Sequence, residues 1–230
     1  MRRSISMITL IFCSLFLIVP TFAQSDESGT AYRVTITNIT KGQIFSPPIA
    51  VVHKRDISLF QLGQPASANL ALMAEDGMAG PLAEELGAHE LVRDVAVSDG
   101  PVMPGQSVTL EVRGDGRFNL VSVAGMLVTT NDTFFALTLD RPPSYDVFVK
   151  NGSSRGMAYG LAEAYDAGTE ANSEDCAFIP GPPCGNGGVH DPAEAEGYVY
   201  ISNGIHGIAD INPDAYDWRS KVAVIQIERL

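Results

Sequence analysis

Near its N-terminal end the sequence reads Tyr32-Arg33-Val34-Thr35-Ile36-Thr37-Asn38-Ile39-Thr40, in which apolar and polar residues alternate and β-branched residues are frequent. Successive side chains of a strand point to opposite faces, so this pattern predicts a strand with one buried face. Comparable alternation, or short apolar runs bounded by turn residues, predicts further strands at 49–53, 108–113, 118–128, 146–150, 198–201 and 223–227.

Two segments between the predicted strands at 49–53 and 108–113 have a helical pattern instead. The segment 67–77 opens with a serine, a favourable N-cap, and closes with a glycine, so it is predicted to form a helix. A second short helix is predicted at 81–87, where proline stands near the start. Short strands, turn-rich spacers and one or two short helical insertions predict an all-β fold, an antiparallel β-sandwich.

The first residues resemble a secretory signal peptide. Two arginines precede an almost wholly apolar run over 5–19, and Thr21-Phe22-Ala23 provides small residues for cleavage. The run is short for a membrane span, and no later stretch is long and apolar enough for one. We therefore expect a signal peptide at 1–23 and a single domain at 24–230 that is secreted or periplasmic.

The chain is acidic, with 27 Asp and Glu against 15 Lys and Arg and a formal net charge of −12. Removal of the signal peptide would also remove two arginines. This charge argues against nucleic acid as a partner and against electrostatic attachment to anionic lipid. It suits cation binding, although a net charge can also serve solubility alone.

Two cysteines lie outside the predicted signal peptide, Cys176 and Cys184, and they flank a short segment rich in proline and glycine. In an oxidising compartment such a pair is expected to form a disulfide. A two-cysteine metal site is the less favoured alternative, because no nearby pair of histidines completes it.

Three acidic residues indicate a calcium site. Asp166 and Glu170 surround a glycine in Tyr165-Asp166-Ala167-Gly168-Thr169-Glu170, and Asp132 lies upstream between two apolar runs. Calcium prefers about six to eight oxygen ligands in flexible geometry, and carboxylates supply them. Gly168 can adopt backbone angles that are closed to other residues and so turn both acids toward one point. The alternative is that these acids are ordinary turn residues that bond their own backbone.

Motifs for nucleophilic catalysis or phosphate binding are missing from the sequence, which contains no Gly-x-Ser-x-Gly elbow and no phosphate-binding glycine loop. A carboxylate pair such as Asp132 and Glu170 could hydrolyse glycosides, so an extracellular hydrolase, assisted by calcium or based on carboxylates, stays the alternative function. His206 lies between glycines and is interpreted as a structural histidine.

Several segments together resemble the spondin N-terminal domain family, which includes F-spondin and mindin. They are Ser46-Pro47-Pro48, Val128-Thr129-Thr130-Asn131-Asp132, Tyr165-Asp166-Ala167-Gly168-Thr169-Glu170, Ile208-Ala209-Asp210 and Tyr216-Asp217-Trp218-Arg219. The resemblance extends from about residue 32 to residue 229 and is closest to the small, single-domain secreted proteins of bacteria. The segment Asp166-Ala167-Gly168-Thr169-Glu170 is its most specific part.

The resemblance implies a C2-like β-sandwich that holds calcium at one end through Asp132, Asp166 and Glu170. It also implies a non-enzymatic adhesion or recognition module whose partner is a protein or a glycan on a surface or matrix. Two departures affect the proposed ion site. Thr133 stands where animal members carry tryptophan, and Glu170 stands where they carry aspartate.

Overall fold

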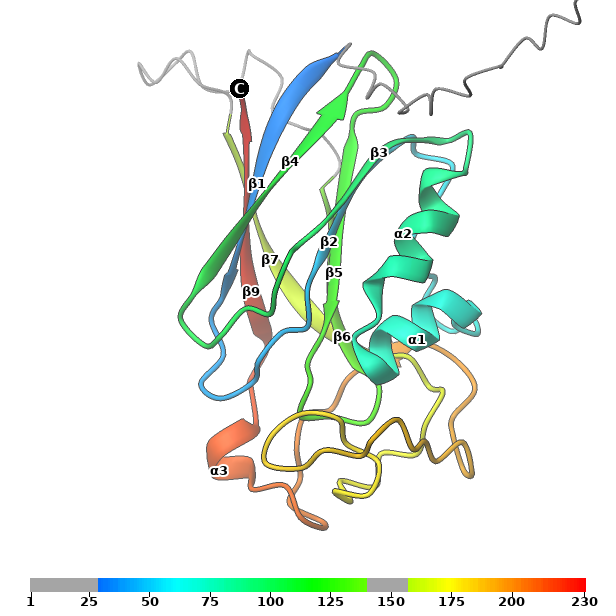
Figure 1. The fold of residues 1–230 in the computed structure, drawn as a ribbon, viewed down its shortest axis with the longest axis vertical. Coiled ribbons are helices and arrows are strands. Elements are labelled where there is room, and N and C mark those ends of the chain that lie inside the picture. Colours follow the sequence, from blue (N-terminus) through cyan, green and yellow to red (C-terminus); the bar gives the residue numbers. More distant parts are fainter. Residues whose placement is uncertain (1–28, 140–156) are drawn as a thin grey trace, which may run out of the picture.

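The computed structural model describes residues 29–139 and 157–230, and Figure 1 shows a curled sheet with two helices on one side and long loops at one end. The strands are β1 (Thr30–Asn38), β2 (Ile49–His53), β3 (Val92–Val97), β4 (Ser107–Gly114), β5 (Leu120–Met126), β6 (Thr133–Leu139), β7 (Met157–Asp166), β8 (Tyr200–Ile201) and β9 (Lys221–Arg229). The helices are α1 (Ala68–Asp76), α2 (Ala79–Gly87) and α3 (Pro213–Tyr216).

All strands belong to one antiparallel sheet in the order β3-β2-β5-β6-β7-β9-β1-β4, with β8 added beside β7. The sheet curls until its two ends meet, and the backbone N–H of Arg113 in β4 donates to Asp94 Oδ2 in β3 at 2.6 Å. The predicted all-β antiparallel fold with short helical insertions is confirmed. The two halves of the sandwich are parts of one continuous sheet.

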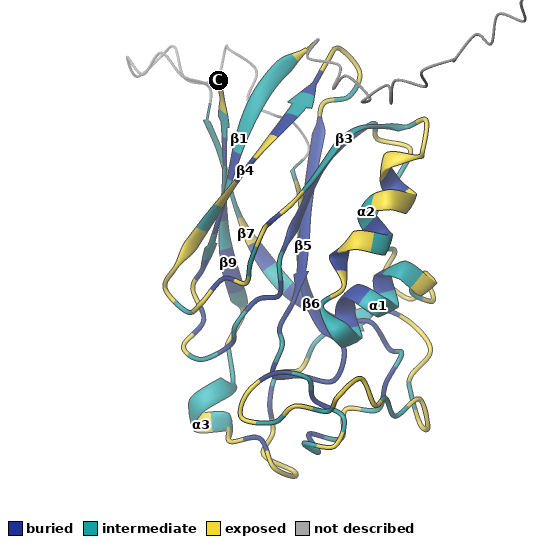
Figure 2. Cartoon of the chain, in the orientation of Figure 1, coloured by how far each residue is buried: buried dark blue, intermediate teal, exposed yellow. Residues whose placement is uncertain are grey.

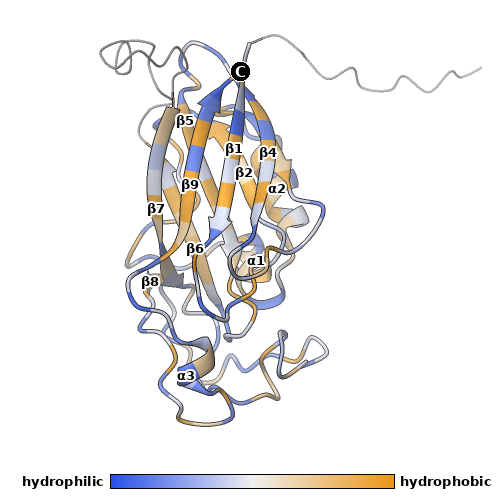
Figure 3. Cartoon of the chain, turned by 90° about the vertical axis from the view of Figure 1, so that its left-hand side faces the viewer, coloured by the Kyte–Doolittle hydropathy of each residue, from blue (hydrophilic) through white to orange (hydrophobic). Residues whose placement is uncertain are grey.

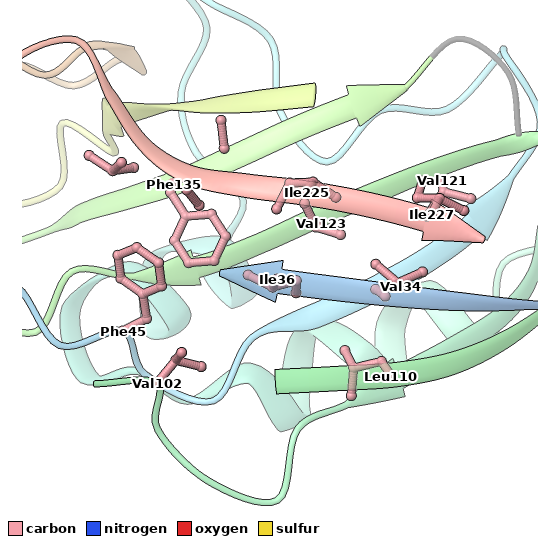
Figure 4. Packing of buried hydrophobic residues seen from close by; sticks show 14 of the residues in the cluster. Val34, Ile36, Phe45, Val102, Leu110, Val121, Val123, Phe135, Ile225 and Ile227 are labelled. Carbon is pink, nitrogen blue, oxygen red and sulfur yellow. The ribbon is translucent and has the colours of Figure 1, made fainter. Parts of the chain in front are cut away.

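The inner faces of the curled sheet enclose the main core. Val34 and Ile36 of β1 point into it and are fully buried, as the alternation in the sequence predicted. Phe45 and Phe135 pack against each other in this core, with ring centroids 4.3 Å apart and ring planes tilted by 35° (Figure 4). Hydrophilic and hydrophobic residues alternate along β1, β4 and β9 (Figure 3).

A second core lies between the outer face of the sheet and the two longer helices (Figure 2). Leu70 and Met73 of α1 are fully buried there against Phe134 of β6. Both predicted helices are present. Ser67 is the N-cap of α1, where its hydroxyl accepts from the backbone N–H of Leu70, and Gly77 ends the helix in the left-handed conformation.

Loss of this cap has a measurable expected effect. Ser67→Ala removes the hydroxyl that accepts from Leu70 N at 3.2 Å and leaves that N–H without its acceptor. We expect the free energy of unfolding to fall by about 1 kcal/mol, the usual value for an N-cap serine. Urea denaturation followed by circular dichroism measures this change. An unchanged midpoint would mean that water replaces the serine oxygen at no penalty.

Three strands were missed by the sequence patterns, and packing explains why. β6 carries adjacent phenylalanines because Phe135 points into the main core while Phe134 points into the helix-covered core, so alternation is absent. β7 contains Gly160, a residue depleted in strands, because a Cβ there would lie 2.3 Å from Leu137 Cδ2. β3 is short and contains charged residues. The predicted strand at 146–150 and the predicted signal peptide lie outside the described residues.

The loop-rich end of the molecule, residues 167–220, has its own small core. Ile179, Ile205 and Ile211 are buried together, with Tyr216 and Trp218 packed beside them. The predicted disulfide between Cys176 and Cys184 is present and closes the segment that contains Ile179. The disulfide and this apolar cluster together hold loops that have little regular secondary structure.

Candidate metal centre

The three acids that the sequence singled out lie at the loop-rich end of the sheet. Asp132 immediately precedes β6, and Asp166 is the last residue of β7, where it pairs with Thr133. The turn after β7 contains Gly168 at φ +66°, and it leads the chain to Glu170. All three side chains are buried, with relative exposures of 0%, 1% and 0% for Asp132, Asp166 and Glu170.

Asp132 is held by the turn that follows β7. Its Oδ2 accepts from the backbone N–H groups of Thr169 and Glu170 at 2.7 and 3.0 Å, and from the Thr169 hydroxyl at 3.2 Å. Its other oxygen, Oδ1, is buried and has no hydrogen-bond partner. One half of this carboxylate is therefore saturated and the other half is unsatisfied.

Asp166 and Glu170 are held in similar ways. Asp166 Oδ1 accepts from Gly168 N, and its Oδ2 accepts from Asn172 Nδ2, both at 2.8 Å. Glu170 Oε1 accepts from the backbone N–H of Asp191 at 2.8 Å, while its Oε2 is buried and has no partner. A buried anionic oxygen without a partner is unfavourable, so the cluster has two positions where a cation would stabilise the fold.

Electrostatics agree with this geometry. Burial, followed by the neighbouring charge of Asp132, raises the pKa of Asp166 to about 7. Burial is also the main reason that the pKa of Glu170 rises to about 7 and that the pKa of Asp132 is raised. Without a cation, these carboxyl groups are therefore protonated at a higher pH in the folded protein than in the unfolded chain.

The cluster is not already arranged as a complete ion site. Within residues 29–139 and 157–230, no group of three or more His, Cys, Asp and Glu side chains is positioned to hold a metal ion. Both oxygens of Asp166 are occupied by hydrogen bonds from Gly168 and Asn172. The residue types and the two unsatisfied oxygens fit calcium, but occupancy requires some of these bonds to be exchanged.

Several polar side chains around the cluster were not found from the sequence. Asn172 Nδ2 lies 2.7 Å from Tyr200 Oη and 3.3 Å from Glu196 Oε1, and the Tyr200 hydroxyl donates to Glu196 at 2.9 Å. Burial, the charge of Asp166 and the bond to Glu196 raise the pKa of Tyr200, so it stays a neutral phenol. In the sequence, the acidic segment 191–196 is the one feature that could have pointed to these residues. Asn172 could also have been considered, because its amide oxygen is a type of group that binds calcium.

His190 connects the cluster to α1. Its Nε2 lies 3.1 Å from Asp76 Oδ1, and its Nδ1 lies 3.7 Å from Glu75 Oε2. Burial lowers the pKa of His190, but the hydrogen bond and charge of Asp76, together with Glu170 and Glu75, raise it overall. The N–H of the next residue, Asp191, donates to Glu170. His190 thus attaches this loop to α1.

Glu174 organises a different part of the loops. Its Oε1 accepts from His206 N at 2.5 Å, and its Oε2 accepts from Gly207 N and Ile208 N at 2.7 and 3.0 Å. The side chain is buried and the residue adopts a positive φ of 54°. Both carboxylate oxygens thus accept hydrogen bonds from the backbone, and these bonds hold the segment 206–208 in place.

A cavity of about 150 Å³ opens beside the cluster. Its inner wall comes from the start of β6 and from the loops, through buried residues such as Asn131, Thr133 and Ile179. Asn203 and His206 are exposed lining residues. Asp132, Asp166 and Glu170 do not line the cavity, but Asn172, Glu196 and Tyr200 do, so the cavity and the carboxylate cluster share a wall.

Comparison with known proteins adds the family. The family described as Spondin_N matches residues 33–141. This match places residues 33–141 in the spondin N-terminal domain family. This matched span includes Asp132 and ends before Asp166 and Glu170. A search of curated proteins finds no match.

Spondin N-terminal domains are extracellular modules of the recognition or adhesion type, and the family is generally non-enzymatic. The disulfide of this spondin domain agrees with an extracellular setting. None of the helices in the described residues is long and apolar enough to span a membrane.

Proposed function

We propose that this spondin domain is a calcium-binding recognition module without enzymatic activity, exported to the periplasm or the cell exterior by the signal peptide at 1–23. One observation carries the calcium assignment. Asp132 Oδ1 and Glu170 Oε2 are both buried and lack any partner among the described residues. Buried carboxylate oxygens that have neither a donor nor a cation are strongly disfavoured, and a bound calcium ion would satisfy them.

Asp132, Asp166 and Glu170 would hold the ion, and Asn172 could turn its amide oxygen toward it. The ion would neutralise carboxylates from the start of β6 and from the turn after β7. It would therefore tie together loops whose own secondary structure is sparse. Because calcium would bind only the folded state, it would raise the stability of the domain by mass action.

Calcium titration of the chelator-treated protein by isothermal calorimetry tests this proposal. We expect one binding event in the wild type and its loss in Asp166→Asn, which keeps the side-chain shape but removes the charge. Asp191→Asn is the matched control, because its carboxylate only accepts from the backbone N–H of Ala193 in a neighbouring turn. That variant should bind calcium like the wild type.

Absence of binding in the wild type would refute the ion site, and the three acids would then be buried turn residues. Equal loss of binding in Asp166→Asn and Asp191→Asn would point to a diffuse effect of negative charge instead of a specific site.

The hydrolase alternative receives less support from the geometry. A reaction centre needs an acidic residue that a substrate can reach, and Asp166 or Glu170 beside His206 in one cavity would have met that need. His206 lines the cavity, whereas Asp166 and Glu170 lie outside it and are buried. The acids that the hydrolase hypothesis names are therefore not placed beside His206 in this cavity.

A further inference from the structure

We propose that the cavity beside the carboxylate cluster binds one residue of an uncharged saccharide. The inference rests on the proposed recognition role of the domain, but it does not depend on calcium at Asp132, Asp166 and Glu170. The cavity is lined by strand ends and loops that are distant in sequence, from Thr130 to His206.

The size of the cavity restricts the ligand. The cavity is small, at about 150 Å³. Pockets for drug-sized ligands are usually about 300–1,000 Å³, so a nucleotide or a large cofactor would not fit. A single sugar ring, or the terminal ring of a longer chain, is of the right size.

The hydrogen-bonding groups of the lining favour a ligand with many hydroxyl groups. The buried part contains the amide of Asn131, which also bonds Ser173 and the Glu174 N–H, and the hydroxyl of Thr133. The half-buried hydroxyl of Ser202 lies 3.3 Å from that of Thr133. The exposed part adds the amide of Asn203, which makes no hydrogen bond within the described residues. Amides and hydroxyls can both donate and accept, and sugar hydroxyls require both.

The apolar part of the lining is small. Ile179 and Ile205 are buried members of the loop core and also line the cavity. Their aliphatic surface can contact the C–H groups of a sugar ring, while the polar side chains face its hydroxyls. This mixture of apolar surface and a few placed polar groups is typical of small-molecule sites.

Among the described residues, the lining contains two carboxylates, Glu174 and Glu196, and no lysine or arginine, so it disfavours anions. The oxygens of Glu174 already accept from three backbone N–H groups. Glu196 already accepts from Tyr200 and lies on the exposed side. An ammonium group offers donors only and would leave the amide N–H groups of the wall unused, whereas a neutral polyol can use the whole set.

The cavity is also held in shape before any ligand binds. Glu174 fixes the segment 206–208, and the disulfide between Cys176 and Cys184 closes the loop that carries Ile179. Rigid walls lower the entropy that must be lost on binding. This supports a preformed binding site in preference to an accidental gap between loops.

Saturation-transfer NMR on the full mature chain tests the proposal, with neutral hexoses, N-acetylhexosamines, deoxyhexoses and pentoses as probes at millimolar concentration. Each probe is measured in chelator and again in calcium, and methylammonium is included as a cationic probe. Asn203→Ala removes one lining amide without breaking a bond within the described residues. Asn119→Ala, an exposed asparagine beside the start of β5, is the matched control.

We expect at least one neutral sugar to bind in both buffers, and Asn203→Ala to weaken it about threefold to tenfold, as the loss of one hydrogen bond predicts. Asn119→Ala should bind like the wild type. The proposal is wrong if no sugar binds in either buffer, if Asn203→Ala binds sugar as tightly as the wild type, or if methylammonium displaces the sugar.

The two proposals fail separately. Sugar binding that depends on Asn203 but persists in chelator would stand even if calorimetry finds no calcium site. Calcium binding without any sugar signal would support the ion site and refute the saccharide proposal.

Discussion

Replacement of Gly168 by alanine is expected to lower the free energy of unfolding by about 4 kcal/mol, through backbone strain and overpacking together. Gly168 adopts φ +66°, and a Cβ added there would lie 2.3 Å from the carbonyl oxygen and 2.8 Å from the nitrogen of Tyr198. Both of these are backbone atoms, so no side-chain rotation can relieve the clash. The expected loss in melting temperature is about 10 °C for a domain of this size.

Gly187→Ala separates the two causes. Gly187 has a similar φ of +64°, but an added Cβ would meet nothing within 4 Å. This variant should therefore lose only the strain contribution, about 1 kcal/mol. Thermal denaturation of both variants measures the difference. Equal effects would show that the backbone at Tyr198 moves away readily, and the turn before Glu170 would then be less constrained than its geometry indicates.

The second large effect concerns pH and calcium together. In the ion-free protein, burial raises the pKa of Asp166 and Glu170 to about 7 from their ordinary values of 3.8 and 4.5. Between these ordinary values and 7, the folded state binds more protons than the unfolded state, so stability falls as the pH rises. We expect the ion-free domain to be about 1.5 kcal/mol less stable at pH 8 than at pH 6.5.

Calcium should reverse this loss of stability at pH 8. At a hundredfold excess over its Kd, calcium is expected to add about 2.7 kcal/mol at pH 8, where the carboxylates are ionised. Its affinity should drop as the pH falls through 7, because protons compete for the same oxygens. Urea denaturation at pH 6.5 and 8, with chelator and with calcium, provides the four stabilities required.

Stabilities are compared only at pH 6.5 and above, because His53 adds a pH dependence of its own at more acidic pH. Burial lowers the pKa of this histidine, so the unfolded state takes up its proton first and stability declines at more acidic pH. Asp166→Asn should reduce the pH dependence above 6.5, since it removes one of the titrating groups. Stability that rises from pH 6.5 to 8 in chelator would contradict the raised pKa values of Asp166 and Glu170.

The fold class followed from local patterns because each pattern has a local cause. Alternation along 32–38 reflects the pleat of a half-buried strand, and Ser67 and Gly77 mark a helix through their own backbone preferences. The strands that escaped prediction are those whose pattern is imposed by neighbours. Gly160 is a glycine because Leu137 occupies the space of its Cβ, and β6 is covered on both faces.

The candidate site divides in the same way. Asp132, Asp166 and Glu170 could be selected from the sequence because acidic residues around a glycine are the residue types that calcium requires. Their burial and the two unsatisfied oxygens depend on the pairing of β6 with β7, which joins positions more than thirty residues apart. No local pattern contains that information.

Residue patterns were enough to predict the all-β class, the disulfide pair, the family and the acidic residues of the candidate centre. Three features appear only in the folded chain: Glu174 holds the segment 206–208, His190 attaches a loop to α1, and Asn172, Glu196 and Tyr200 lie between the centre and a polar cavity. The physical reason is that hydrogen bonding and desolvation act between atoms that are close in space, whereas residue patterns report only neighbours along the chain.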